Sequence, residues 1–486
     1  MRQQSDYYSK ASRIRRRQFL RSCAAVGMIA GGTSAVQAMS KLAGNSIADA
    51  GRRPNIVFIL ADDLGFRDVG FQGGRIKTPN IDKLAARGTK LDQFYVQPVC
   101  SPTRSSFMTG RYPMRNGMQV GVVRPWARHG LPLEERTLAQ ALKEAGYVTA
   151  IHGKWHLGHL NDKYLPTSRG FDRQYGHYNG ALDYFTHIRD KGLDWNRNDK
   201  PLLEEGYITD LIGKESTRVI AEHDKSKPLF LYVPFNAVHS PFQAPNSYID
   251  KYSNIKQNRR RIYAAMTTAM DDAIGQITDA LEKRGMSENT LIVFCSDNGG
   301  AGSIADNGPL RGHKGQLYEG GIRVPAVAIW PGVLGAGTVV DEPLHIVDMY
   351  PTFINLAGGS LKQPLPIDGK DAWPAITNGK PTPHEEILHN ITPATGAIRV
   401  GDWKLIWNGQ ITANYTGSRP QKDKWELFNI AKDPYEKNNL ADKHPEKFKQ
   451  LKRRLDYYAS KAVKPNIPPN RMPADFKVPK AWGHPD

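Results

Sequence analysis

Acidic and amide side chains follow two apolar segments that are predicted to form buried strands. Asp62 and Asp63 come directly after the first segment, and Asp297 and Asn298 follow the second. Because the carboxyl ends of parallel strands meet at one edge of a sheet, we expect these four side chains to converge. Three carboxylates and an amide supply the all-oxygen ligands that Ca²⁺ or Mg²⁺ prefers, so zinc does not fit. Each pair alone would also fit a turn or a helix cap, and the metal site is predicted from their combination.

Lysine and histidine side chains follow two further apolar segments and occupy one glycine-rich loop. Lys154 and His156 come after one segment, His239 comes after the other, and Lys314 lies in the loop. Lysine and histidine beside a metal could bind a tetrahedral oxyanion and protonate its leaving group. One such residue alone would more often be structural or solvated. The prediction therefore rests on their joint placement at strand ends.

A cysteine stands at the predicted start of a helix. Residues 100–104 read C-S-P-T-R, and the helix is expected to end near Gly110. Pro102 suits the first helical turn, and an anionic nucleophile is stabilised at a helix N-terminus. The alternative is an ordinary cysteine beside a helix start.

Short apolar segments alternate with helical patterns from about Arg53 onward. Segments rich in β-branched residues and separated by helices predict a mostly parallel sheet that is covered on both faces. Helices are expected over residues 137–145 and 262–284, each followed by glycine, and the second carries apolar residues at helical spacing for packing. The predicted strands cover residues 56–60, 148–151, 229–233 and 291–294.

The character of the sequence changes after about Leu361. Pro-rich connections lead to a strand-turn-strand pattern over residues 397–406, a charged helix over 445–459 and a Pro- and Lys-rich tail after Ala462 that should form an extended arm. We expect an α/β fold with a large, mostly parallel sheet sandwiched by helices, and a smaller C-terminal antiparallel sheet with a helix. The predicted domain bounds are residues 53–365 and 366–486.

The N-terminal residues 1–38 have the order of a twin-arginine export signal. Arg15, Arg16 and Arg17 precede an apolar, glycine-containing stretch and a small-residue cleavage site at Ala38. That stretch is too short for a stable membrane anchor. We expect the twin-arginine export machinery to deliver the protein to the periplasm or beyond, and the alternative is a basic tail.

The net charge indicates which binding partners are possible, and the number of cysteines indicates which of them has a chemical role. The chain has 486 residues and a formal charge of +18, of which residues 1–38 contribute a net six. A basic surface attracts polyanions without choosing among nucleic acid, lipid and acidic polysaccharide. Cys23 would leave with the signal, and Cys295 lies in a predicted buried strand where it can act as a small hydrophobe. Cys100 is then the cysteine that needs a chemical explanation, because exported proteins rarely keep a free thiol.

The C-x-P-x-R form of residues 100–104 is the form read by enzymes that oxidise a sulfatase cysteine to formylglycine. Together with other segments, it makes the chain similar to type I sulfatases of the alkaline phosphatase superfamily, and most similar to their arylsulfatase B-like branch. The other segments are residues 109–112, 153–158, 239–241, 296–299, 310–321, 426–429 and 433–434. The resemblance covers nearly the whole mature chain and implies an alkaline phosphatase-like fold and sulfate ester hydrolysis.

The resemblance also implies the nucleophile and the cation. One hydroxyl of hydrated formylglycine (3-oxoalanine) 100 would attack sulfur and expel the alcohol, and deprotonation of the other would release sulfate and restore the aldehyde. A formylglycine-generating enzyme or an anaerobic sulfatase-maturating enzyme would have to convert Cys100. The cation is expected to be Ca²⁺, with Mg²⁺ possible. Its ligands would be Asp62, Asp63, residue 100, Asp297 and Asn298.

The remaining catalytic residues receive roles from the same resemblance. Lys154 and Lys314 would bind sulfate oxygens, and Arg104 would orient residue 100. His156 would take the proton that frees sulfate from residue 100. His239, with help from Lys314, would protonate the leaving oxygen.

Export and positive charge favour a sulfated polysaccharide or oligosaccharide as substrate, such as a carrageenan or a glycosaminoglycan, and no nucleic acid partner is expected. Asp183 and His187 are candidates for contacts with sugar hydroxyls. Aromatic residues that could stack on sugar rings, with a place in the core as the alternative, are Trp126, Tyr178, Tyr184 and Trp195.

Two other functions remain open at this stage. The first is a phosphonate monoester hydrolase or phosphodiesterase of the same superfamily. The second is a noncatalytic binder of sulfated glycans whose cysteine is never converted. The set Lys154, His156, His239 and Lys314 looks more like that of a sulfatase, and retention of every expected active-site residue argues against a binder.

Overall fold

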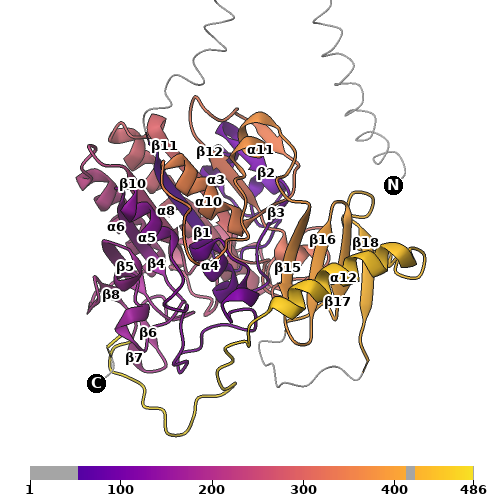
Figure 1. Cartoon of the computed structure of the whole chain (residues 1–486). Helices are drawn as coiled ribbons and strands as arrows, with labels where there is room; N and C mark the ends of the chain where they lie inside the picture. The colour runs from indigo at the N-terminus through magenta and orange to yellow at the C-terminus, as the bar shows by residue number, and fades with distance from the viewer. Residues whose placement is uncertain (1–52, 412–421, 485–486) are drawn as a thin grey trace, which may run out of the picture. The chain divides into compact units, whose positions relative to one another are not determined.

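The computed structural model describes residues 53–411 and 422–484, so the predicted export signal over residues 1–38 lies outside the described residues. Within the described residues, ten strands form a central sheet in the order β13-β2-β12-β11-β1-β10-β4-β5-β8-β9 (Figure 1). Its five middle strands, from β11 to β5, are parallel. They are β11 (Thr290–Ser296), β1 (Asn55–Ala61), β10 (Leu229–Pro234), β4 (Val148–Lys154) and β5 (Arg173–His177). The mostly parallel sheet and the four predicted strands are thereby confirmed.

The outer strands of this sheet are short and mostly antiparallel. Only β13 runs parallel to its neighbour β2. The outer strands are β13 (Thr338–Val340), β2 (Thr89–Leu91), β12 (Ala326–Ile329), β8 (Asn196–Arg197) and β9 (Lys200–Pro201). Short two-residue strands elsewhere are β3 (Phe94–Tyr95), β6 (Ile188–Arg189), β7 (Gly192–Leu193) and β14 (Leu344–His345).

Alternate side chains of β1 enter two separate hydrophobic cores, as expected for a strand that is covered on both faces. Val57 and Ile59 belong to one core, and Phe58 and Leu60 belong to the other. The first core contains residues of α3 (Pro79–Arg87), α6 (Ile208–Glu222) and α8 (Asn258–Lys283). The second contains residues of α4 (Cys100–Thr109), α5 (Leu138–Glu144), α10 (Met349–Leu356) and α11 (Trp373–Asn378).

The helix ends follow local chemistry that the sequence displays. Thr137 and Gln140 form a reciprocal capping box at the start of α5. Gly110 ends α4 in the left-handed conformation, with a φ of 66°. Helix α8 begins at Asn258, four residues before the predicted start, because its polar first turn has no apolar periodicity. Arg260 in that turn pairs with buried Asp68 and so gives the extra turn a tertiary partner.

A separate four-stranded antiparallel sheet lies near the C-terminus, as predicted. Leu451 and Leu455 of α12 (Pro445–Lys461) pack on one of its faces. Leu317 and Tyr318, which follow the loop of Lys314, pack on the other face. The strands are β15 (Glu386–Ile391), β16 (Gly396–Val400), β17 (Trp403–Trp407) and β18 (Trp425–Asn429). The division at residue 365 stays a prediction.

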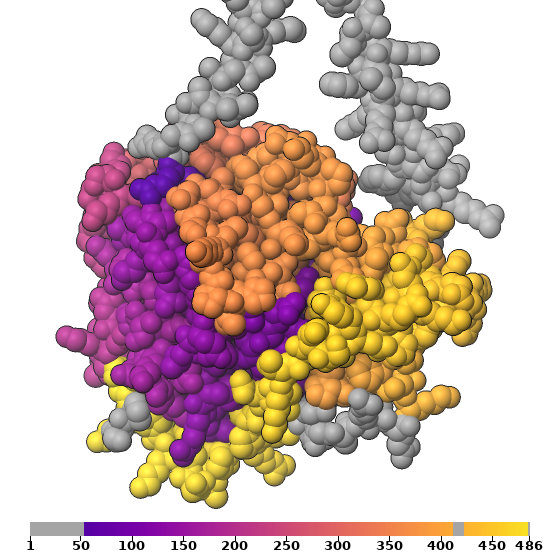
Figure 2. Space-filling view, in the orientation of Figure 1, coloured from indigo at the N-terminus to yellow at the C-terminus, as the bar shows by residue number. Residues whose placement is uncertain are grey.

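The tail after α12 is an extended arm, as expected. Figure 2 shows this yellow segment crossing the face of the molecule. The backbone N–H of Val463 donates to Met114, and Trp482 near the end is fully buried. The indole N–H of Trp482 donates to the carbonyl of Arg189, so the arm is fixed at both ends. None of the described helices has the length and apolar character needed to cross a membrane.

Candidate active site

The carboxyl edge of the central sheet gathers the predicted site residues. Asp62 and Asp63 follow β1, Asp297 follows β11, and Lys154 is the last residue of β4. The sheet ladder continues into these turns, because the backbone N–H of Asp297 donates to Ala61 at 2.9 Å. The strand ends therefore hold these side chains on rigid backbone, as the sequence predicts for a parallel sheet.

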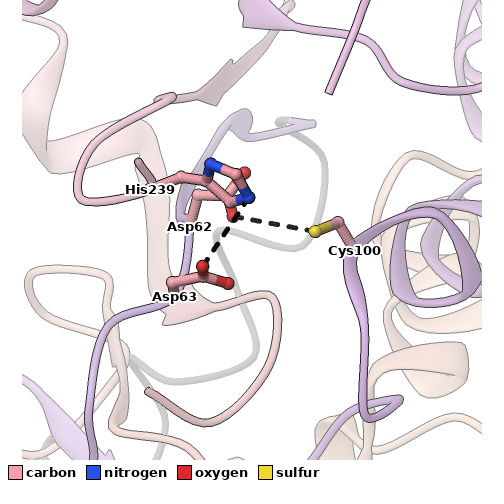
Figure 3. A group of neighbouring side chains, drawn as sticks. All are labelled: Asp62, Asp63, Cys100 and His239. Atoms are coloured by element: carbon pink, nitrogen blue, oxygen red, sulfur yellow. Dashed lines mark hydrogen bonds and ion pairs between the residues drawn. The ribbon is translucent and has the colours of Figure 1, made fainter. Parts of the chain in front are cut away.

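Cys100 opens helix α4 and faces the acidic cluster. Its Sγ lies 3.7 Å from Oδ1 of Asp62, and the side chain is 2% exposed. Figure 3 shows this thiol pointing toward Asp62, with Asp63 and His239 beside it. One possible ligand atom from each of these four residues lies within 4.8 Å of the others. The nucleophile candidate and two of the predicted metal ligands therefore share one small volume.

Arg104, one turn further along α4, ties the acidic residues together. One guanidinium nitrogen donates to Asp62 at 3.1 Å and to Asp297 at 2.8 Å, and the other donates to the carbonyl of Lys154 at 2.9 Å. Arg104 and both carboxylates are fully buried. The Nζ of Lys154 donates to the same oxygen of Asp62. A planar guanidinium can bridge two carboxylates in this way, whereas a lysine acts as a point charge.

Asp63 is held from the opposite side. Nζ of Lys314 lies 2.8 Å from Oδ2 of Asp63, and the side-chain amide of Asn298 donates to Oδ1 at 2.8 Å. Nε2 of His239 lies 3.7 Å from Oδ2. The side chains of His239 and Lys314 are 19% and 21% exposed, whereas Lys154 is fully buried. His239 and Lys314 therefore form the solvent side of the cluster, where the leaving group of a substrate would lie.

The pKa values of two neighbouring carboxyl groups, Asp62 and Asp297, shift in opposite directions in the buried cluster. Burial and the charge of Asp62 raise the pKa of Asp297 to about 7. Burial is the strongest single influence on Asp62 and opposes its ionisation, but the nearby positive charges, Lys154 first, together outweigh burial and hold the pKa of Asp62 below its usual range. A divalent cation would relieve the repulsion between these two carboxylates.

The donor set also fits such a cation. Among the described residues, no hydrogen-bond donor reaches the buried Oδ1 of Asn298. An unpaired buried acceptor is costly, and coordination of a cation would satisfy it. Carboxylate and amide oxygens are ligands of Ca²⁺ and Mg²⁺. Asp62, Asp63, Asp297 and Asn298 would therefore hold a hard cation beside residue 100.

The two histidines of the site differ in environment. Nε2 of His156 lies 3.0 Å from the carbonyl of Val123, and burial followed by the Lys154 charge lowers the pKa of His156 well below its usual value. Nδ1 of His239 lies 2.6 Å from the carbonyl of Ser240. Burial and the Lys314 charge lower the pKa of His239 to about 4, so this imidazole is neutral at pH 7 before an anion binds.

Comparison with known proteins assigns this arrangement to a family. The profile of the family described as Sulfatase matches residues 54–360. The chain belongs to the sulfatase family. The profile described as N-sulphoglucosamine sulphohydrolase, C-terminal, matches residues 313–461 of this sulfatase. The predicted resemblance is thereby confirmed, the chain is a sulfuric ester hydrolase, and the arylsulfatase B-like branch stays a prediction.

Relatives and solved structures agree with this assignment. The sulfatase is 41% identical to Arylsulfatase J of Mus musculus over 468 residues, which cover 86% of this chain and 77% of that protein. It is 33% identical to Arylsulfatase A of Homo sapiens over 447 residues, or 82% and 87% of the two chains. It is also similar to Ps i-CgsB in complex with k-i-k-neocarrahexaose, at a TM-score of 0.78 and 34% identity over 85% and 94% of the two chains.

The structure adds two buried residues that the sequence analysis of this sulfatase missed. His177 ends β5 opposite Lys154 on β4, and burial and the Lys154 charge lower its pKa well below the usual value. Ser101 donates to the carbonyl of His156 at 2.9 Å and accepts from the N–H of Val123 at 3.1 Å. Residues 173–177 (R-Q-Y-G-H) form no apolar segment that would mark a strand end at His177, and Ser101 occupies a variable position of the C-x-P-x-R motif, so the sequence signals neither residue.

The aromatic substrate candidates are mostly buried. The hydroxyl of Tyr184 donates to the carbonyls of Asn236 and His239, each at 2.8 Å, so this side chain supports the His239 loop. Tyr178 and Trp195 are fully buried in the sulfatase. For Tyr178, Tyr184 and Trp195, the structure therefore favours the alternative interpretation, in which these side chains pack in the core. A direct contact between Tyr184 and a sugar stays a prediction.

The other substrate candidates lie in different settings. His187 is buried, and its Nε2 lies 3.0 Å from the carbonyl of Gly206. Asp183 accepts from the backbone N–H of Thr186 and from Gln243, which organises the loop that leads into Tyr184. The partly exposed Trp126 donates from its indole N–H to the carbonyl of Pro469 in the C-terminal arm. Their roles in substrate binding stay predictions.

Proposed function

We propose that this sulfatase hydrolyses sulfate esters of a sulfated polysaccharide or oligosaccharide, with residue 100 acting as formylglycine. The observation that carries the proposal is the position of Cys100. It stands at the start of α4, 3.7 Å from Asp62, in a cluster that Lys154 and Lys314 flank from two sides. In this position the oxygen of a converted residue would lie beside both the proposed cation ligands and the lysines proposed to bind sulfate.

An unconverted thiol would perform poorly here. Burial, with the Asp62 charge in second place, raises the pKa of Cys100 to about 12, so the thiol stays protonated at neutral pH. An ordinary serine or cysteine that attacked sulfur would also leave a sulfated enzyme that is slow to hydrolyse. A hydrated aldehyde avoids this problem, because its second hydroxyl can be deprotonated to expel sulfate and restore the aldehyde.

The buried cations orient the reacting groups. Arg104 fixes Asp62 and Asp297 and donates to the carbonyl of Lys154, so it holds the start of α4 against two strand ends. Lys154 and Lys314 lie on opposite sides of the acidic pair and would each bind a sulfate oxygen. A bound Ca²⁺, or Mg²⁺ in its place, would polarise the sulfate and favour the ionised form of residue 100.

The two histidines would move protons at different steps. His156 is buried next to α4 and would accept the proton from the second hydroxyl of residue 100. His239 lies at the solvent side and would protonate the leaving oxygen. The negative charge of a bound sulfate ester would favour the imidazolium form of His239 and so prepare it to act as an acid.

Replacement of His239 by alanine tests that assignment through the leaving group. We expect His239→Ala to slow desulfation of a sugar sulfate about 10²- to 10⁴-fold, the usual contribution of a general acid, because an alkoxide needs a proton to leave. An activated aryl sulfate, whose phenolate leaves unaided, should react almost as fast as with the wild type. The measurement is kcat/KM for both substrates.

The control variant is His156→Ala, which should lower kcat for both substrates, because His156 acts after the leaving group has departed, in a step that kcat reports and kcat/KM does not. Equal losses for the two substrates with His239→Ala would remove the general acid role from His239.

The carbohydrate part of the proposal rests on three observations. Ps i-CgsB, to which the chain is similar, was crystallised with a carrageenan oligosaccharide. The chain is strongly basic, which favours polyanionic substrates, and residues 1–38 have the order of an export signal. We propose twin-arginine export and action in the periplasm or outside the cell.

The test is inorganic sulfate released from carrageenans, chondroitin and dermatan sulfates, ulvan and fucoidan. We expect release from one of these polymers by the wild type and none by Cys100→Ala, the blank. Turnover of a phosphonate ester without any sulfate release would instead favour a phosphonate hydrolase. A residue 100 that remains a thiol in protein from its native host would favour the noncatalytic binder, and mass spectrometry of that peptide decides this point.

A further inference from the structure

A lysine of the C-terminal sheet is buried against two carboxylates. Lys404 lies on β17 and is fully buried on the face of the sheet that Leu317 and Tyr318 cover. Its Nζ lies 2.8 Å from Glu319 and 2.8 Å from Glu436, and both glutamates are fully buried. A buried charge of this kind is tolerated only when partners compensate it, so the three groups form one unit.

Both carboxylate oxygens and the backbone N–H of Glu319 have partners that hold this residue in place. Oε1 pairs with Lys404, Oε2 accepts from the hydroxyl of Tyr95 at 2.8 Å, and the backbone N–H donates to Glu436 at 2.7 Å. Arg399 donates to the hydroxyl of Tyr95 in turn, at 2.7 Å. Two residues of the C-terminal sheet therefore set the place of Glu319, directly or through Tyr95.

Glu319 begins the short helix α9 (Glu319–Ile322), which touches the turn after Asn298. The backbone N–H of Gly299 donates to the carbonyl of Gly321 at 2.9 Å. A Cβ on Gly299 would lie 1.9 Å from the carbonyl oxygen of Gly320, so the two backbones are as close as glycine allows. A shift of α9 would therefore displace the turn that carries Asn298.

The loop that leads into α9 carries Lys314. The backbone N–H of Lys314 donates to the carbonyl of Gly300 at 3.1 Å, and Arg311 at the start of the loop donates to the carbonyl of Glu436 at 2.9 Å. Residues that support Glu319 therefore also support the loop of Lys314. One buried ion cluster is linked to a cation ligand and to a sulfate-binding lysine.

We infer that Lys404 is a positioning residue for the active site, acting through Glu319 on Asn298 and Lys314. The inference rests on the proposed function only in the roles given to those two residues. Without the Lys404 charge, the carboxylates of Glu319 and Glu436 would repel each other in a buried space. They would separate, and α9 would move away from the Asn298 turn.

Calorimetric titration with Ca²⁺ and turnover of an aryl sulfate test this inference in Lys404→Met. We expect the Kd for Ca²⁺ to rise and kcat to fall, each about 10- to 100-fold, as is typical when a partner of a metal ligand is lost. The matched control is Leu427→Ala. Leu427 is fully buried on the opposite face of the same sheet, toward α12, so its loss should lower the Tm and leave both quantities near their wild-type values.

Two further variants keep the result decisive. Lys404→Arg retains the charge and should recover part of the Ca²⁺ affinity. If Lys404→Met does not fold, Lys404→Gln also removes the charge, while its amide can still donate to one carboxylate, and it should weaken Ca²⁺ binding in the same way. The inference is overturned if folded Lys404→Met, or Lys404→Gln in its place, binds Ca²⁺ as the control does. A wild type that binds Ca²⁺ without turning over sulfate esters would refute the proposed function alone, because the comparison of Ca²⁺ affinities still tests Lys404.

Discussion

Alanine at position 100 should abolish sulfate ester hydrolysis, with a loss of kcat of about 10⁴-fold or more, as is usual when a covalent nucleophile is removed. The proposed cation ligands and the lysines proposed to bind sulfate would remain in Cys100→Ala, but no group would be left to attack sulfur. The measurement is single-turnover release of sulfate from an aryl sulfate, combined with mass spectrometry of the peptide that contains residue 100.

The chain supplies a matched control for this experiment in Cys295. Neither Cys100 nor Cys295 forms a disulfide within the described residues, and both are buried. Cys295 lies in β11 inside the hydrophobic core, so Cys295→Ala should cost some stability and leave turnover intact. Full activity of protein in which residue 100 is still a thiol would contradict the formylglycine mechanism.

Replacement of Arg104 by methionine should produce the second large effect. Arg104 compensates two fully buried carboxylates, Asp62 and Asp297, and its loss leaves them with less positive charge. Breaking a buried ion pair from one side typically costs about 3–5 kcal/mol. We expect the free energy of unfolding of Arg104→Met to fall by about that amount in the presence of a chelator, and turnover to be lost.

Denaturant unfolding with and without Ca²⁺ measures this effect, because added cation should recover part of the lost stability. Arg260→Met is the control, since Arg260 pairs with buried Asp68 and not with a proposed cation ligand. That variant should lose stability yet keep turnover. An Arg104→Met protein as stable and as active as the wild type would show that Arg104 does not balance the acidic cluster.

The sequence was sufficient to predict four of the five parallel strands in the middle of the sheet and most of the cluster. Four apolar segments were long enough to identify as buried strands, and polar residues at their carboxyl ends had to meet at one edge of the sheet. Asp62, Lys154 and Asp297 were found by this rule, and the structure places them within one hydrogen-bonded network around Arg104.

The burial of side chains in loops was harder to predict, because a loop sequence has no periodicity that separates buried from exposed residues. Tyr184 was a candidate for contact with sugar, yet it is fully buried, whereas its neighbour Phe185 is 43% exposed. The pairing of Lys404 with Glu319 could not be predicted either, because the two residues are far apart in the sequence. The strand pattern around Lys404 also does not indicate which residue would pair with a buried lysine. Such contacts follow from tertiary packing and not from local pattern.

The order of strands in the central sheet limits the time during which an enzyme can modify Cys100. Strand β1 is paired on both sides by strands made much later, because Ile56 lies beside Phe230 on β10 and Leu291 on β11. A ribosome adding about 5–20 residues per second needs roughly 10–40 s to pass from Cys100 to the end of β11. Once the central strands have paired, Cys100 is buried. A modifying enzyme must therefore reach Cys100 while the chain is still being made, or after synthesis but before folding is complete.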